Sequence, residues 1–201
     1  WCHPVLFQRL VAAKETRGTK IVVIDPRRTA TAEIADLHLA LAPGSDVALF
    51  NGLLLAIAGG NATDRAYLDA HTSGFRDAFK SASKMPIREI AQITGLPTSQ
   101  LHAFYDLFVR TDRTVTVYSQ GVNQSVAGTD KVNAIINCHL LTGRIGTPGA
   151  GPFSVTGQPN AMGGREVGGL ANQLAAHMAI EDEGHRAIVA DFWKAPRIAD
   201  H

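Results

Sequence analysis

The chain has 201 residues, of which 45% are hydrophobic, and is long enough to bury the core of at least one globular domain. Its 19 lysines and arginines balance 18 aspartates and glutamates to a formal net charge of +1, with no run of like charge, so binding to nucleic acid through a basic surface is not indicated. The longest apolar run, Val47–Ala58, contains Asn51 and Gly52 and is too short to cross a bilayer, so we expect neither a nucleic-acid nor a membrane partner.

The first helix and the first strand are predicted between Pro4 and Ile24. Proline suits a first helical turn, and apolar residues recur with helical spacing up to Lys14, so we expect a helix that ends near Gly18. The β-branched run Ile21–Ile24 is typical of a buried strand in a parallel sheet. Because the sequence starts at Trp1 and a phosphate-binding glycine turn would have to precede this helix, we expect a fragment of a longer protein.

The turn that follows this strand, Asp25-Pro26-Arg27-Arg28-Thr29, is the first candidate site. Ligands of doubly wound sheets bind at the carboxyl ends of the strands. An aspartate at that place can hold a ribose hydroxyl, and arginines can bind phosphates. A solvated turn whose charges pair with one another is the alternative, and the residues alone do not decide between the two.

A second strand-to-helix turn places Ser45 and Asp46 near the same edge. Leu37–Leu41 is a predicted short strand, and Ala42-Pro43-Gly44 turns the chain into a helix that begins at Ser45. Ser45 can cap that helix, and Asp46 complements its dipole. The Asp46 carboxylate can instead accept both N–H groups on the edge of a guanine.

The next part of the chain is helical and carries little chemistry. Four helices are predicted, over residues 64–70, 75–81, 87–93 and 98–110. The two cysteines, Cys2 and Cys138, are each followed by a histidine. Neighbouring residues on a helix point about 100° apart, so Cys138 and His139 are poorly placed to share a metal ion. We expect both to be structural, predict no metal site, and expect a reducing, cytoplasmic setting.

A further strand, Thr114–Ser119, is closed by Gln120-Gly121-Val122-Asn123-Gln124. The neutral amides of Gln120 and Gln124 suit the edges of a heterocycle that presents both donors and acceptors, although amides also serve as ordinary turn residues. A helix is predicted over Thr129–Thr142. Its expected buried side consists of Val132, Ile135, Ile136, His139 and Leu140.

The segment Gly143–Gly169 holds nearly half of the 19 glycines and a third of the 9 prolines of the chain. Such a composition predicts neither a regular helix nor a regular strand. A flexible linker is one interpretation, but the remaining large side chains favour an ordered loop whose backbone passes close to a large polar ligand. Two helices are predicted beyond it, over residues 171–180 and 185–193.

Several motifs together resemble one known family. They are Trp1–Leu6, Val23–Thr29, Leu41–Asp46, Gly121–Gln124 and Phe153–Gly169. They resemble the large subunit of assimilatory nitrate reductases, which are molybdopterin oxidoreductases that carry two pterin guanine dinucleotides on one molybdenum. The resemblance covers essentially the whole sequence in order, and the run Gly157–Gly168 is specific to the nitrate-reductase branch.

The resemblance implies an α/β fold with a doubly wound, mostly parallel sheet and flanking helices, plus part of a second α/β domain. Residues 1–144 would form a Rossmann-like domain that binds the molybdopterin dinucleotide. Residues 145–201 would supply the glycine-rich active-site loop and the start of the second domain.

The resemblance also implies roles for individual residues. Arg165 matches an arginine of the substrate funnel, and Gln120 would lie near the pterin and the metal, where periplasmic relatives carry a methionine. A guanidinium suits a planar oxyanion such as nitrate, although Arg165 can alternatively pair with Glu166. The implied cofactor-binding residues are Asp25, Pro26, Arg27, Arg28, Thr29, Gly44, Ser45, Asp46, Gly121, Gln124, Gly157 and Gln158.

The implied reaction is the reduction of nitrate to nitrite in the cytoplasm. Electrons would come from ferredoxin, flavodoxin or an NADH-dependent reductase through a [4Fe-4S] cluster. The cysteines for that cluster and for the molybdenum are not in this sequence, so we expect the isolated chain to be inactive. Another molybdopterin enzyme, of the formate dehydrogenase type, and a non-catalytic Rossmann nucleotide-binding module are the alternatives.

Overall fold

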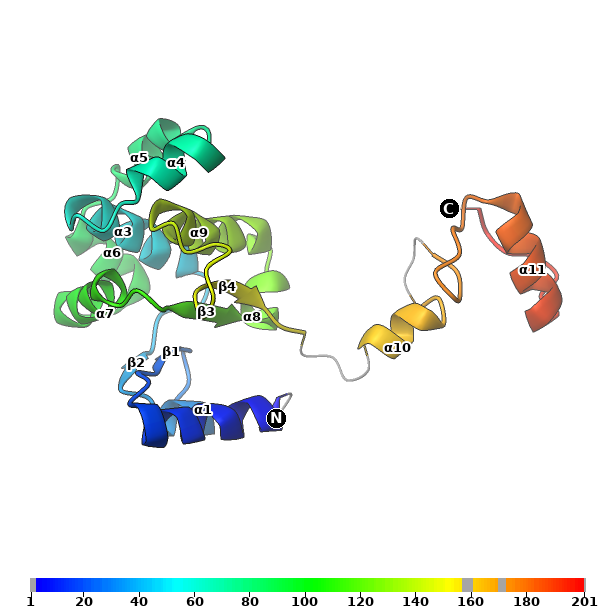
Figure 1. Ribbon diagram of the computed structural model, residues 1–201, viewed down its shortest axis with the longest axis horizontal. Helices are drawn as coiled ribbons and strands as arrows, with labels where there is room; N and C mark the ends of the chain where they lie inside the picture. Colours follow the sequence, from blue (N-terminus) through cyan, green and yellow to red (C-terminus); the bar gives the residue numbers. More distant parts are fainter. Residues whose placement is uncertain (1–2, 157–160, 170–172, 201) are drawn as a thin grey trace. The chain divides into compact units, whose positions relative to one another are not determined.

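The computed structural model describes residues 3–156, 161–169 and 173–200. The chain divides into two compact units, His3–Val155 and Thr156–His201, apart from the first two residues (Figure 1). The class is α/β, as predicted, because helices alternate with parallel pairs of short strands. Within the described residues no helix combines the length and the apolar composition that crossing a bilayer requires.

The described strands form two parallel pairs, both in the first unit. Strand β1 (Val22–Ile24) pairs with β2 (Leu37–Leu39), with Val23 opposite His38. Strand β3 (Val115–Tyr118) pairs with β4 (Gly151–Ser154), with Val117 opposite Phe153. The predicted parallel pairing is therefore confirmed, and within the described residues the strands form two two-stranded sheets.

The predicted absence of regular structure from the glycine-rich segment is wrong. Strand β4 lies in this segment, held by a hydrogen bond from Gly151 N to Thr114 O (2.9 Å) and another from Val155 N to Tyr118 O (2.9 Å). Helix α10 (Ala161–Glu166) lies there as well. Both depend on backbone hydrogen bonds, which glycine makes as well as any other residue.

The predicted helices, except the one over residues 171–180, are found with small changes at their ends. They are α1 (Pro4–Arg17), α3 (Asp46–Gly59), α4 (Arg65–His71), α5 (Phe75–Ala82), α6 (Ile87–Thr94), α7 (Thr98–Arg110), α9 (Gly128–Leu141) and α11 (Glu183–Trp193), with two short additions, α2 (Ala30–Glu33) and α8 (Gln120–Asn123). As expected, α1 ends near Gly18, which follows its last residue, Arg17, and has a left-handed φ of 67°.

The helix expected over residues 171–180 is not found in its described part, residues 173–180. Ala176 and His177 have positive φ values of 55° and 58°, which a right-handed helix excludes. Isolated antiparallel bridges join Val167 to Ala175 and Gln173 to Ala179 instead.

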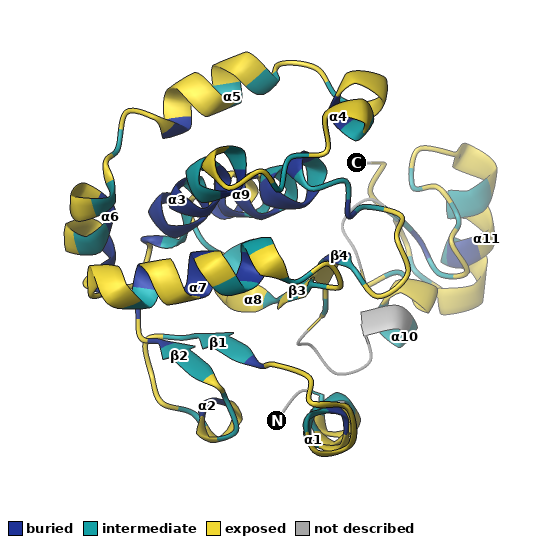
Figure 2. Cartoon of the chain, turned by 60° about the vertical axis from the view of Figure 1, so that its left-hand side comes forward, coloured by how far each residue is buried: buried dark blue, intermediate teal, exposed yellow. Residues whose placement is uncertain are grey.

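The core of the first unit is built around α3. Leu49, Leu53 and Ile57 are fully buried on this helix, which packs against α9, α7 and α6 (Figure 2). The Tyr105 hydroxyl of α7 donates a hydrogen bond to Leu49 O (3.0 Å). A Cβ atom on Gly52 would collide with that hydroxyl, so glycine is what lets α7 lie against α3.

Cys138 and His139 are both buried in α9, as expected of structural residues, but the expectation of a satisfied histidine holds for only one ring nitrogen, since His139 Nδ1 has no hydrogen-bond partner among the described residues. The Cys138 thiol donates to Phe50 O (3.3 Å), and burial raises its pKa. His139 Nε2 lies 2.7 Å from Thr116 Oγ1, which ties α9 to β3. Burial, and secondarily the Arg144 cation, lower the pKa of His139 to about 4, so the imidazole is neutral at pH 7.

Arg144 fixes the end of α9 to α7. Its Nη2 donates to Phe108 O (2.9 Å) and to Thr111 O (2.6 Å), and its guanidinium lies 4.4 Å from the centroid of the Phe108 ring.

The prediction of which face of α9 is buried is only partly correct. Ile135 is buried as expected, but Val132, Ile136 and Leu140 are half-buried, and Lys131 is buried in their place.

Replacement of Gly52 by alanine should weaken the α3–α7 contact. We expect Gly52→Ala to lower the free energy of unfolding by about 2 kcal/mol, because the added methyl group displaces the Tyr105 hydroxyl from its acceptor. Gly59→Ala is the matched control in the same helix, since no atom lies within 4 Å of its Cβ position. Urea denaturation that gives equal stabilities for the two variants would contradict this role of Gly52.

Protonation of His139 should destabilise the fold in mild acid. The pKa of His139 is about 4 in the fold and 6.5 in the unfolded reference, so its contribution is complete above pH 6.5 and disappears as the pH falls to about 4. We expect this residue to remove about 2 kcal/mol of stability between about pH 7.5 and about pH 5. His139→Gln should lack that decrease, whereas His102→Gln, at an exposed position of α7, should keep it. Identical pH profiles for His139→Gln and the unmodified chain would refute the assignment.

Candidate functional site

The predicted site residues of the first unit follow the carboxyl ends of three strands. Residues 25–29 follow β1, residues 44–46 lie beyond the end of β2, and residues 120–124 lie beyond the end of β3. They therefore lie on two strand pairs rather than on one sheet edge. Gly157 and Gln158 lie outside the described residues, and Arg165 belongs to the second unit.

The turn after β1 is held by its own aspartate. Asp25 Oδ1 accepts a hydrogen bond from Arg27 N (2.7 Å), while His38 Nε2, a contact that sequence reasoning missed, lies 2.9 Å from Asp25 O. Pro26, Arg27 and Arg28 are exposed, and neither guanidinium forms an ion pair with any described residue. The mutual charge pairing considered as an alternative for this turn is therefore not formed. The two cations remain available to an anionic ligand.

The turn after β2 leads directly into the first turn of α3. Gly44 has a φ of 88°, and no atom lies within 4 Å of its Cβ position. Ser45 is the N-terminal flanking residue of α3, but its hydroxyl donates to Ala42 O (2.6 Å) and does not cap the helix, so the predicted cap is wrong. Asp46 Oδ2 lies 2.7 Å from Lys131 Nζ, and only 16% and 5% of these two side chains are exposed.

The segment after β3 forms the single-turn helix α8. Gln120, Gly121 and Gln124 are exposed, and the two glutamine amides form no side-chain hydrogen bond within the described residues. Asn123 Nδ2 donates to Ser154 Oγ (3.1 Å), which ties α8 to the end of β4. At Gly128 a Cβ atom would lie 2.7 Å from Asn123 O, so this glycine lets α9 begin directly against α8.

Lys131 of α9 joins two of these segments, and sequence reasoning missed it. In addition to its ion pair with Asp46, its Nζ donates to Gly121 O (3.4 Å). No hydrogen bond or ion pair joins residues 25–29 to residues 120–124 within the described part of the chain. A signal was present, since Lys131 falls on the buried helical spacing of Gly128, Ile135 and Cys138.

Arg165 lies on the short helix α10 of the second unit and is exposed. Its expected alternative partner, Glu166, pairs with His177 through Oε1 and Nε2 at 2.8 Å. Gln173 Nε2 donates to the backbone carbonyl of Arg165 (3.0 Å) and leaves the guanidinium untouched. The guanidinium therefore forms no ion pair with a described residue.

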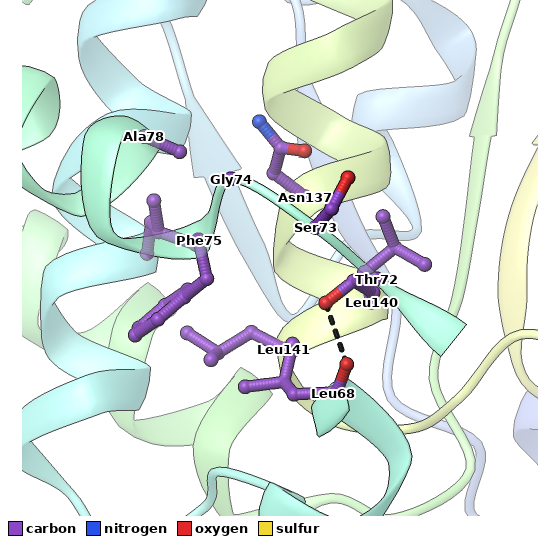
Figure 3. A pocket seen from close by; sticks show the side chains of 10 residues that line it. Leu68, Thr72, Ser73, Gly74, Phe75, Ala78, Asn137, Leu140 and Leu141 are labelled. Carbon is purple, nitrogen blue, oxygen red and sulfur yellow. Dashed lines mark hydrogen bonds between the residues drawn. The ribbon is translucent and has the colours of Figure 1, made fainter. Parts of the chain in front are cut away.

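Two pockets of the first unit lie away from these residues. One of about 60 Å³ is lined mostly by apolar side chains of α3, α4, α5 and α9, and the Thr72 hydroxyl at its rim donates to Leu68 O (2.8 Å; Figure 3). Another, of about 480 Å³, lies beside Gly52, Ile90 and Tyr105. The predicted site residues line neither of these two pockets. Pro26, Arg27, Arg28, Gly44, Gln120, Gly121 and Gln124 are exposed, whereas Ser45 is buried. Among the described residues no cluster of three or more histidine, cysteine or acidic side chains is arranged to hold a metal ion.

The donor set of the predicted site residues suits a long, polar, anionic ligand. Exposed guanidinium groups bind phosphates, and free amides match the edges of a heterocycle. Gly44 and Gly121 leave open space where a Cβ would stand, so a ligand can approach the backbone there. A carboxylate at a helix start can accept two N–H donors. The residues present therefore fit a pterin dinucleotide.

Comparison with known proteins agrees with this chemistry. Relatives include a nitrate reductase of Shewanella frigidimarina, 52% identical over 100% of this chain, and one of Klebsiella oxytoca, 54% identical over 99% of it. The chain spans 21% and 22% of the lengths of these relatives. The solved structure of the acetylene hydratase from Pelobacter acetylenicus matches 69% of this chain and 19% of its own, with a TM-score of 0.64 and 27% identity.

The family model described as molybdopterin oxidoreductase matches residues 1–192, nearly the whole chain. The chain belongs to the molybdopterin oxidoreductases.

Proposed function

We propose that this chain is the central cofactor-binding part of a molybdenum enzyme that reduces nitrate to nitrite. The observation that carries the proposal is the identity of 52% and 54%, over essentially the whole chain, to two relatives named nitrate reductase. The unpaired polar groups at the strand ends support it, because they offer the donors and acceptors that a pterin guanine dinucleotide needs.

The cofactor of the proposal is a molybdenum bis-molybdopterin guanine dinucleotide. When bound, it supplies the oxygen-atom transfer and the change of redox state. The chain supplies binding and orientation. Arg27 and Arg28 neutralise phosphates, Asp25 and Thr29 hold a ribose, and Pro26 keeps the turn in shape.

The other end of the dinucleotide and the pterin use the remaining segments. Asp46 accepts the two N–H groups of guanine, and Gly44 and Ser45 let the backbone of the turn approach the base. Gln120, Gly121 and Gln124 offer amide and backbone groups to the pterin and shape the surroundings of the metal. Gly157 and Gln158, outside the described residues, complete this set in the proposal.

Arg165 is proposed to bind nitrate. A guanidinium presents two parallel N–H donors to a planar oxyanion and keeps its charge at every working pH. Its lack of an ion pair within the described residues supports this role, because a guanidinium already paired with a carboxylate would bind an anion less well.

The wider setting of the enzyme is also a proposal. The glutamine at position 120 favours the assimilatory branch and a cytoplasmic location, since the resemblance assigns a methionine there to periplasmic relatives. Ferredoxin, flavodoxin or an NADH-dependent reductase would donate electrons. A [4Fe-4S] cluster and a cysteine ligand for molybdenum would come from other parts of a longer polypeptide, since the chain spans only 21% and 22% of the lengths of the two relatives.

The full-length polypeptide provides the test of the proposed function. Purified protein should contain molybdenum and release about two guanine nucleotides per metal on acid hydrolysis, and it should form nitrite from nitrate with a reduced viologen. Oxidation of formate without nitrate reduction would assign the chain to another branch of the family. Specific binding of NAD to a protein free of molybdenum would indicate a Rossmann nucleotide-binding module instead.

Removal of the Arg165 guanidinium should weaken nitrate binding and leave the cofactor in place. In the full-length enzyme, we expect Arg165→Ala to raise KM for nitrate at least about tenfold, the effect of one lost charge-assisted hydrogen bond. The molybdenum content should stay unchanged. Arg197→Ala removes another exposed arginine of the second unit and should alter neither quantity. Loss of molybdenum in Arg165→Ala would make Arg165 a cofactor-binding or structural residue.

A further inference from the structure

The buried ammonium of Lys131 is a cation at the candidate site to which the proposed function gives no role. Its side chain is 5% exposed, and a lysine is rarely buried to this extent unless it is paired. Both of its partners belong to predicted cofactor-binding segments. Asp46 Oδ2 lies at 2.7 Å, in the first turn of α3, and Gly121 O lies at 3.4 Å, in α8.

This position connects three helices. Lys131 lies in the first turn of α9, and Asp46 begins α3. Gly121 belongs to α8, which begins at Gln120 and is followed directly by Gln124. The close approach of Gly128 to Asn123 O keeps the start of α9 against α8. One ammonium therefore fixes the spacing between the carboxylate after β2 and the amides after β3.

The Asp46 carboxylate keeps acceptor capacity beyond this ion pair. Each carboxylate oxygen has two lone pairs, and the ammonium uses one of those on Oδ2. No other side-chain hydrogen bond to Asp46 is formed within the described residues, and 16% of its side chain is exposed. The carboxylate can thus accept further N–H donors from solvent or from a ligand while the ammonium holds its orientation.

We infer that Lys131 is a positioning residue of the cofactor site, which aligns the Asp46 carboxylate for the guanine base and holds α8 at a fixed distance from it. The inference rests on the proposed function and adds a residue to it. A lysine that only stabilised the fold would need neither of these two partners in particular.

Lys14 offers a matched control within the same chain. Its Nζ also binds one carboxylate, Asp36 Oδ2 at 3.0 Å, and one backbone carbonyl, Ile34 O at 2.8 Å. These partners lie between α2 and β2, before the strand begins, and not at the strand ends of the site. Lys14→Met therefore removes the same kind of interaction without touching the proposed cofactor surface.

The test uses the full-length enzyme and four variants: Lys131→Met, Asp46→Asn, the double variant and Lys14→Met. The readouts are molybdenum per polypeptide, guanine nucleotide released by acid, and the melting temperature. We expect Lys131→Met and Asp46→Asn each to lower the molybdenum content and the guanine nucleotide content about tenfold. A decrease of this size is the effect of one lost charge-assisted hydrogen bond. Lys14→Met should keep the content of the unmodified enzyme.

The double variant separates positioning from charge compensation. It leaves no unpaired charge, so we expect it to melt at a higher temperature than Lys131→Met and still to lack the cofactor, with no greater loss than either single variant. If Lys131→Met fails to fold, the molybdenum and guanine nucleotide contents of the double variant provide the test.

Three outcomes would overturn the role of Lys131. They are full loading of Lys131→Met, an equal loss in Lys14→Met, and recovery of loading in the double variant. An unmodified enzyme that contains neither molybdenum nor guanine nucleotide would instead reject the proposed function, so the two failures can be told apart.

Discussion

The arrangement of the candidate site depends on the ion pair between Lys131 and Asp46. A buried ammonium without a partner destabilises a fold strongly, so the first turns of α9 and α3 must stay where the two charges meet. This requirement links the strand-end segment after β2 to the one after β3, although the two belong to different strand pairs. The geometry of the polar surface is thus set by electrostatics within the first unit.

The packing of α3 supplies the rigidity that this ion pair needs. Seven residues of the helix are buried, and α9 and α7 lie against it. Gly52 allows the close approach of α7 and Gly128 that of α8 to α9, because a Cβ atom at either position would meet a neighbouring oxygen. The exposed polar groups therefore belong to segments that are held by closely packed helices, as a site that binds a large ligand requires.

Much of the fold follows from the sequence, because most of the helices and three of the four described strands carry a clear pattern: helical periodicity, the continuous apolar run of β1, or the alternation of β2 and β3. Strand β4 does not, since Gly151-Pro152-Phe153-Ser154 has no alternation and forms only because β3 offers a partner. The sequence identified three candidate segments by their position at strand ends: the turn after β1, the turn after β2, and the segment that forms α8. Lys131 was missed because a lysine is normally assigned to the surface. The predicted capping of α3 by Ser45 is not formed because the hydroxyl donates to Ala42 O instead.

The two units differ in how firmly they hold their functional groups. The first unit buries a continuous apolar cluster beneath the strand ends. In the second unit Leu174 and Val189 are the hydrophobic residues buried among those described, while Phe192 and Trp193 of α11 are 81% and 48% exposed. Few buried contacts mean low local stability. The proposed cofactor surface of the first unit therefore depends on packing and on the Lys131–Asp46 ion pair, whereas the proposed role of Arg165 would depend on the charge and donor geometry of its own side chain.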